Sequence, residues 1–137
     1  MASSQTVLPP ASRLTGRILL VFSALSGAVT VGLGAFAAHG LKGSLSPYLL
    51  GVFETGVQYQ AWHSLAMLAC VILSRILGSK QVLYAALFFA VGIVFFSGSL
   101  YALALTGIKW FGPITPMGGV CFIIGWVVLA IAAWRSS

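Results

Sequence analysis

The sequence predicts an all-α integral membrane protein, built as an up-down bundle of four transmembrane helices. Of its 137 residues, 60% are hydrophobic and only 6% are charged, whereas soluble domains carry roughly 25% charged residues. The apolar residues also gather into four runs, and a spanning helix needs about 20 predominantly apolar residues. A surface this poor in charge has to be covered by something apolar, and a lipid bilayer provides that cover.

The apolar runs divide the chain into a short tail and one membrane domain. Residues 1–12 are mostly small and polar and include two prolines, so we expect a disordered N-terminal tail. The predicted four-helix domain covers residues 13–137, with spans at about 18–38, 60–77, 82–105 and 116–134. Residues 35–37 (Ala-Phe-Ala) resemble a signal-peptide cleavage site, but signal h-regions are only about 7–15 residues long. An uncleaved anchor is therefore the favoured interpretation.

The second helix is predicted to be longer than the membrane is thick. Ser46 and Pro47 form a favourable helix start, with serine at the N-cap and proline at the first helical position. A helix from there to Leu77 would be about 46 Å long, against about 30 Å for the hydrocarbon core. We therefore expect an amphipathic, interfacial lead into this span, with tilt or a bend at Gly51 or Gly56.

The charges predict an orientation and argue against nucleic-acid binding. The net charge is +6, but the cations are scattered singly or in pairs between apolar runs, without the basic stripe that nucleic acids require. The side that carries the termini would hold Arg13, Arg17, Arg75, Lys80 and Arg135. The other side would hold only Lys42 and Lys109. Because cytoplasmic loops are enriched in Lys and Arg, both termini are predicted to be cytoplasmic.

Polar side chains within or beside the spans are the candidate functional residues. Ionisable groups at membrane depth are costly and suggest function by default. The candidates are His39, Glu54, Gln58, Tyr59, His63, Ser99 and Tyr101, and all are predicted to lie in the outer half of the bundle. Glu54 is the only acid in the chain. At about 100° per residue, Glu54 and His63 fall on opposite edges of the second helix, so they could share a ligand only if that helix bends.

Three interpretations of these residues stay open. The first is an interhelical hydrogen-bond network that holds the bundle together, with Glu54 paired to Lys42, Lys109 or a histidine. The second is a small-ligand or proton site in which Glu54 or His63 titrates. The third is a metal or haem site with His39 and His63 as ligands, but no HxxxH or Cys/His spacing supports it. With one acid and no Ser-His-Asp set, we expect a non-enzymatic protein without cofactor or metal.

Four motifs in order give the chain a family resemblance. They are GAFAAHGL at 34–41, FETGVQYQ at 53–60 followed by His63, FSGSLY at 96–101 and GPITPMGG at 112–119. Together they resemble the YgdD-like family, domain-of-unknown-function family 423, from about residue 14 to the C-terminus. The resemblance implies a small, multi-pass protein of the bacterial inner membrane with four spanning helices. It implies no activity.

The function expected from the sequence is therefore binding rather than catalysis. The leading hypothesis is a membrane protein that binds or stabilises a partner, a lipid or a complex. Its partners would be the lipid bilayer and a membrane protein or a second copy of the chain. The alternative is transport of a small solute or a proton through the outer-half polar residues, for which a chain this small would need to form an oligomer.

Overall fold

The computed structural model describes residues 8–136, and most of them are helical. The elements in chain order are α1 (Pro10–Phe36), η1 (Ala37–Leu41), α2 (Pro47–Leu77), α3 (Gln81–Gly92), η2 (Ile93–Ser97), α4 (Gly98–Thr106), η3 (Lys109–Ile114) and α5 (Thr115–Arg135). Read as continuous helices, they form four candidate spans, Pro10–Leu41, Pro47–Leu77, Gln81–Thr106 and Lys109–Arg135. Each is long and apolar enough to cross a membrane. The predicted all-α membrane fold is confirmed.

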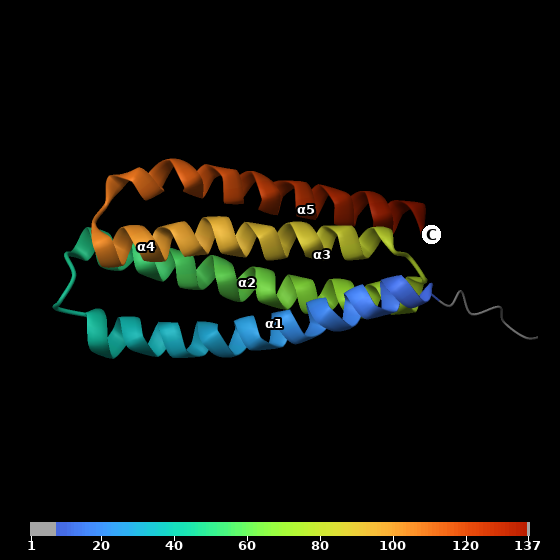
Figure 1. Cartoon of the computed structure of the whole chain (residues 1–137), viewed down its shortest axis with the longest axis horizontal. Coiled ribbons are helices and arrows are strands. Elements are labelled where there is room, and N and C mark those ends of the chain that lie inside the picture. Colours follow the sequence, from blue (N-terminus) through green and yellow to red (C-terminus); the bar gives the residue numbers. More distant parts are fainter. Residues whose placement is uncertain (1–7, 137) are drawn as a thin grey trace, which may run out of the picture.

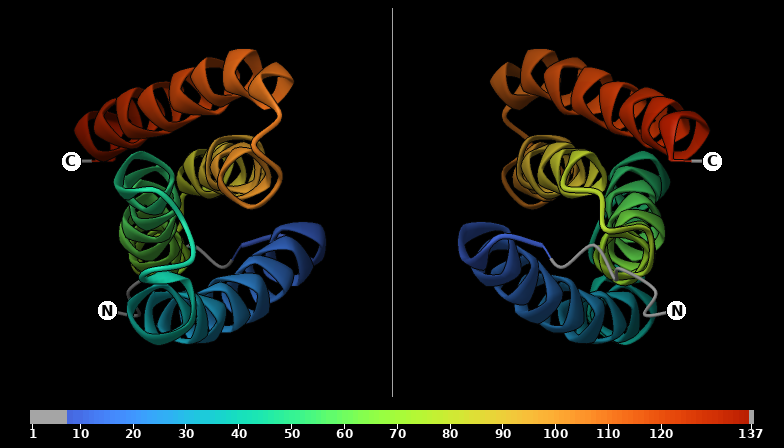
Figure 2. Two further views of the ribbon diagram at one scale, coloured as in Figure 1. Left: turned by 90° about the vertical axis from the view of Figure 1, so that its left-hand side faces the viewer. Right: turned by 90° about the vertical axis from the view of Figure 1, so that its right-hand side faces the viewer.

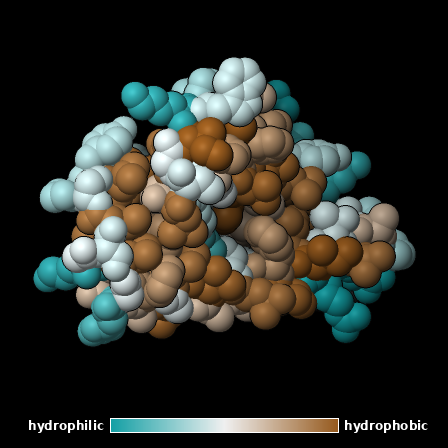
Figure 3. Space-filling model, turned by 60° about the vertical axis from the view of Figure 1, so that its left-hand side comes forward, coloured by the Kyte–Doolittle hydropathy of each residue, from teal (hydrophilic) through white to brown (hydrophobic). Residues whose placement is uncertain are grey.

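The helices form a layered bundle rather than a closed square. Helix α2 and the continuous helix made of α3, η2 and α4 lie side by side in the middle, with α1 against one side and α5 against the other (Figures 1 and 2). Helix α1 packs mainly on α2, and α5 packs mainly on α3. Sequential helices run antiparallel, as short connections require. Hydrophobic side chains cover most of the face shown in Figure 3, with hydrophilic ones around its margin.

Both of the first two helices begin earlier than the predicted spans. Helix α1 starts at Pro10, with proline at its first position, so residues 10–12 are helical and not part of a disordered tail. The rest of the predicted tail, residues 1–7, lies outside the described residues. Helix α2 starts at Pro47, where Ser46 Oγ accepts a hydrogen bond of 3.2 Å from the Leu49 amide. The predicted lead into the second span is therefore the first part of one long helix.

Gly56 lies where α4 packs against α2. Helix α2 is one α-helix from Pro47 to Leu77, without interruption at Gly51 or Gly56. A Cβ atom at Gly56 would lie only 2.7 Å from Cε1 of Tyr101. The Ser97 hydroxyl donates a 2.7 Å hydrogen bond to the Gly56 carbonyl. The absence of a side chain at Gly56 therefore lets α4 approach the backbone of α2 closely.

The third span contains a π-helical turn that the sequence did not predict. Segment η2 joins α3 to α4 within the range expected to be one regular helix, and π-turns are rare insertions in α-helices. Gly118 of α5 packs directly on this turn, where an added Cβ would lie 2.3 Å from the Phe96 amide nitrogen. Such a contact involves backbone rather than a flexible side chain. It fixes how deeply α5 sits against η2.

Candidate functional site

Contacts between helices show which residues lie at the same depth in the membrane. The rings of Phe36 and Phe53 are 6.3 Å apart and so share one level. Phe36 lies nineteen residues after Arg17 (36 minus 17), or about 28 Å along the helix. That distance is close to the hydrocarbon thickness of about 30 Å. If Arg17 marks one boundary, Phe53 and the adjacent Glu54 mark the opposite one, and Ser26 lies near the middle of the membrane.

The predicted site residues separate into two sets on different sides of α2. His39, Glu54 and Gln58 are exposed. His63 and Ser99 are buried, and Tyr59 and Tyr101 are half-buried. In the first set, His39 and Glu54 lie at or beyond the hydrocarbon boundary and Gln58 lies about one turn inside it, while the second set reaches into the bundle. The seven predicted residues therefore do not form a single polar site.

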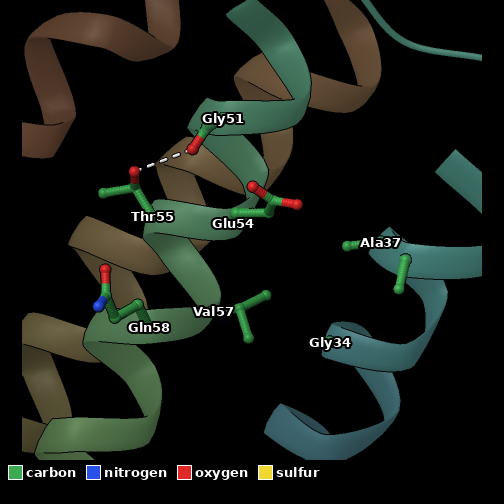
Figure 4. A pocket seen from close by; sticks show the side chains of 8 residues that line it. Gly34, Ala37, Gly51, Glu54, Thr55, Val57 and Gln58 are labelled. Carbon is green, nitrogen blue, oxygen red and sulfur yellow. Dashed lines mark hydrogen bonds between the residues drawn. The ribbon is translucent and has the colours of Figure 1, made fainter. Parts of the chain in front are cut away.

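Glu54 lines a pocket between α1 and α2, which we call the α1–α2 pocket. It has a volume of about 540 Å³ and is lined by Gly34, Ala37, Ala38, Gly51, Glu54, Thr55, Val57 and Gln58. The wall opposite α2 is formed by the end of α1 and the start of η1, and its lining residues carry no side chain larger than a methyl group, which leaves space there. Figure 4 shows the Glu54 side chain directed from α2 toward Ala37, while Thr55 and Gln58 project from another side of the helix.

The Glu54 carboxylate has no partner within the described residues. It makes neither an ion pair nor a hydrogen bond through its side chain there. The expected pairing with Lys42, Lys109 or a histidine is therefore not found. Glu54 lies two turns inside α2 and faces α1, whereas Lys42 follows η1 and Lys109 begins η3, which packs on α4.

A buried hydrogen-bond network, here called the Gln60 network, joins three helices near the middle of the membrane. The Gln60 amide nitrogen of α2 donates to the Ser26 carbonyl at 3.2 Å and to Ser26 Oγ at 3.1 Å. The Ser64 hydroxyl donates to Ser26 Oγ at 2.7 Å. The Tyr101 hydroxyl of α4 donates to Gln60 Oε1 at 2.6 Å. Helix α1, much of which is exposed, is thus tied to α2 and, through Gln60, to α4.

Only Tyr101 of this network was among the predicted site residues. Gln60 falls away from the Glu54 face of the helix, and Ser26 and Ser64 look like ordinary small packing residues in apolar runs. One signal was available, because Gln60 and Ser64 are four residues apart and share a helix face. A buried amide needs hydrogen-bond partners, so a second polar residue on that face points to a polar contact.

His63 is held between α2 and α5 with both ring nitrogens engaged. The Trp126 indole N–H donates to Nε2 at 3.1 Å, and Nδ1 lies 2.7 Å from the Tyr59 carbonyl. Because an indole nitrogen can only donate, Nε2 is the acceptor and a neutral ring carries its proton on Nδ1. The ring also stacks on Phe122 with a centroid distance of 3.6 Å. This arrangement leaves no ring nitrogen free for a metal.

The remaining predicted residues take part in helix packing or lie apart from the network. Ser99 and Thr115 share a 2.6 Å hydrogen bond between their hydroxyls, which links α4 to the start of α5. The Tyr59 ring packs against Phe96 at 4.6 Å. His39 is exposed in η1 and is not brought to His63. Within residues 8–136, no three histidine, cysteine or acidic side chains are grouped so that they could hold a metal ion.

Four apolar spans joined by short turns, with their polar side chains paired between helices, define a small multi-pass integral membrane protein. The family described as "Protein of unknown function (DUF423)" matches residues 33–119. A UPF0382 membrane protein of Staphylococcus aureus is 46% identical over 119 residues, which cover 87% of this chain and 97% of the relative. The chain belongs to this family, as the four sequence motifs indicated.

Two further relatives come from other bacteria. The UPF0382 inner membrane protein YgdD of Escherichia coli K12 is 40% identical over 122 residues, covering 89% of this chain and 93% of the relative. The UPF0382 membrane protein YwdK of Bacillus subtilis is 42% identical over 118 residues, covering 85% and 96%. No solved structure matches the chain. These names agree with a membrane location and specify no activity.

Proposed function

We propose that this protein is a non-enzymatic membrane binding protein whose α1–α2 pocket holds an amphiphile with an ammonium headgroup. The observation that carries the proposal is Glu54. The only acidic side chain of the chain points into the α1–α2 pocket and has no partner among residues 8–136. The proposed ligand class is an amine-headed phospholipid such as phosphatidylethanolamine.

Electrostatics supports a cationic ligand. Opposite charges about 4 Å apart attract by roughly 1 kcal/mol in water and by several times more where the effective dielectric constant is low. Glu54 lies at the estimated hydrocarbon boundary, where a carboxylate is less well solvated than in bulk water. The protein supplies no cation to it within the described residues, so a cation from the membrane can provide the stabilising charge.

The shape of the pocket supports an amphiphile rather than a soluble metabolite. Its volume of about 540 Å³ lies in the usual range for small-molecule sites. One wall consists of Gly34, Ala37 and Ala38, which offer apolar contact and no hydrogen-bonding side chain. A lipid could place its ammonium group at Glu54 and its chain against this wall.

The transport alternative has less support from the geometry. A proton or solute pathway needs polar groups with free hydrogen-bonding capacity along its length. Both ring nitrogens of His63 are engaged, and the Gln60 network is closed among its own members. Glu54 lies apart from both groups, on the pocket side of α2.

The test compares lipid binding in the wild type and in Glu54→Gln, which removes the charge and keeps the side-chain size. Purified protein in nanodiscs of equal phosphatidylethanolamine and phosphatidylglycerol is released for native mass spectrometry, and the bound lipids are counted. We expect the retained phosphatidylethanolamine to fall about tenfold, the equivalent of 1.4 kcal/mol. Ala38→Leu should have the same effect, because it fills the pocket without changing its charge.

Lys109→Gln is the matched control, since it changes one charge at the same end of the bundle but outside the pocket. It should retain as much phosphatidylethanolamine as the wild type. The thermal midpoint of Glu54→Gln should stay unchanged, because no bond within the described structure is lost. Undiminished phosphatidylethanolamine retention in a folded Glu54→Gln variant would refute the proposal.

A further inference from the structure

All arginines of the chain lie at one end of the bundle. Arg13 is in the first turn of α1, Arg75 is in the last turn of α2, and Arg135 ends α5. Arg17 lies one turn further along α1, and Lys80 immediately precedes α3. At the opposite end, the Arg and Lys positions are both lysines, Lys42 and Lys109. Figure 1 shows the start of α1, the α2–α3 turn and the end of α5 together at one end.

Three of these cations lie about one helical turn beyond a single contact between α1, α2 and α3. A Cβ atom at Gly16 of α1 would lie 3.8 Å from the Val71 side chain and 3.7 Å from the Leu83 side chain, so these three positions share one level. Arg13 lies three residues before Gly16, Arg75 four residues after Val71, and Lys80 three residues before Leu83. Each is thus about one turn beyond the same contact, in the same direction along the bundle.

No acidic side chain among the described residues pairs with this cluster. Arg13, Arg75 and Lys80 are all exposed, and they form no ion pair within residues 8–136. Glu54, the only acid of the chain, lies toward the opposite end of α2. Within residues 8–136, the cluster therefore presents three unpaired positive charges about one turn from Arg17, at the same end of the bundle.

We propose that Arg13, Arg75 and Lys80 form a binding site for the phosphate of an anionic phospholipid headgroup, such as that of phosphatidylglycerol. A guanidinium group presents paired N–H donors that fit two phosphate oxygens at once, whereas an ammonium group acts as a point charge. The orientation of a membrane protein depends on the positive charge of its loops, and lysine and arginine supply that charge equally well. One end of the bundle carries five cations, four of which are arginines, and the other end carries no arginine. This preference for arginine fits recognition of phosphate by paired N–H donors.

The position of the site favours a lipid phosphate over a soluble phosphate as its ligand. Its three cations surround the ends of spanning helices, at the level where lipid phosphates sit. Basic side chains between helix ends at one membrane face are a recognised arrangement for binding anionic headgroups. This proposal is independent of the α1–α2 pocket, which lies toward the other end of the bundle and carries the opposite charge.

The experiment measures lipid selectivity in nanodiscs of phosphatidylglycerol and phosphatidylcholine at equal amounts, by native mass spectrometry of the released protein. We expect the wild type to retain phosphatidylglycerol preferentially. Each neutralised cation should lower that preference about fivefold, so Arg13→Gln/Arg75→Gln should lose most of it. Lys42→Gln/Lys109→Gln, with the same change in net charge at the other end, should keep it.

A charge-conserving variant tests the role of the guanidinium groups. Arg13→Lys/Arg75→Lys retains the net charge and should lose part of the selectivity, because it forms no paired contacts with phosphate. Elution as a single species in gel filtration shows that each variant is folded. The proposal is wrong if the wild type shows no preference, if both glutamine pairs lose it equally, or if the lysine variant keeps all of it.

Discussion

Gln60 of α2 and Ser26 of α1 are joined by two hydrogen bonds near the middle of the membrane. The amide nitrogen of Gln60 reaches both the carbonyl of Ser26 at 3.2 Å and its hydroxyl at 3.1 Å. In lipid, where apolar surface gives no preference for one helix face over another, such contacts help to set which faces meet. This pair therefore defines the register of α1, the helix with the least burial in the bundle.

Replacing Gln60 should destabilise the bundle. Gln60→Leu removes the bonds to Ser26 and leaves the hydroxyl of the half-buried Tyr101 without its acceptor. Interhelical hydrogen bonds average about 0.6 kcal/mol each in membranes, so we expect a loss of about 1–2 kcal/mol and a lower thermal midpoint in detergent. Gln58→Leu, an exposed position two residues away, is the control and should change stability little. Equal midpoints for the two variants would contradict the assigned role of Gln60.

His63 should carry its proton on Nδ1. The Trp126 indole donates to Nε2 at 3.1 Å, and that contact is available only to the tautomer protonated at Nδ1. Nitrogen NMR of histidine-labelled protein distinguishes the two tautomers, and exposed His39 supplies an internal reference. Trp126→Phe removes the donor and should allow a mixture of tautomers. A His63 signal from the Nε2-protonated ring in the wild type would show that the contact with Trp126 is absent.

Gly118 and Gly119 should respond differently to the same substitution. A methyl group at Gly118 would meet the Phe96 backbone at 2.3 Å, whereas at Gly119 its nearest neighbour is the Phe96 ring at 3.8 Å. Gly118→Ala should cost about 1–3 kcal/mol through overpacking. Gly119→Ala should be neutral or slightly stabilising, because alanine favours helices over glycine. Unfolding in detergent measures both, and similar stability for the two variants would show that α5 does not approach η2 this closely.

The orientation predicted from charge can be tested with single cysteines. In a Cys70→Ala/Cys121→Ala background, a membrane-impermeant maleimide should label Lys42→Cys and Lys109→Cys in intact cells. Lys80→Cys should be labelled only after the membrane is opened, because it lies at the predicted cytoplasmic end. The reverse pattern would invert the orientation, and labelling of all three in intact cells would mean that the cells were leaky.

Much of the fold could be predicted because hydropathy and charge are properties of single segments. The four apolar runs predict the number of spans, and Ser46 with Pro47 predicts where α2 begins. The wheel of α2 also separates Glu54 from His63, and in the structure one faces the α1–α2 pocket while the other packs against Phe122 and Trp126. A continuous helix allows no other arrangement, since about 100° per residue fixes their relative directions.

The partners of each polar side chain were decided by the tertiary structure. The hydrogen-bond interpretation pairs Glu54 with a cation or a histidine, but Glu54 has no partner within residues 8–136. Gln60, which is not among the predicted site residues, lies at the centre of a buried network. The sequence of a single helix cannot predict these hydrogen-bond partners, because they depend on which faces of four helices meet and at what depth. Close contacts such as Gly118 on Phe96 set that geometry. The sequence by itself therefore determined how many helices cross the membrane, and helix packing determined which polar groups pair and which remain open.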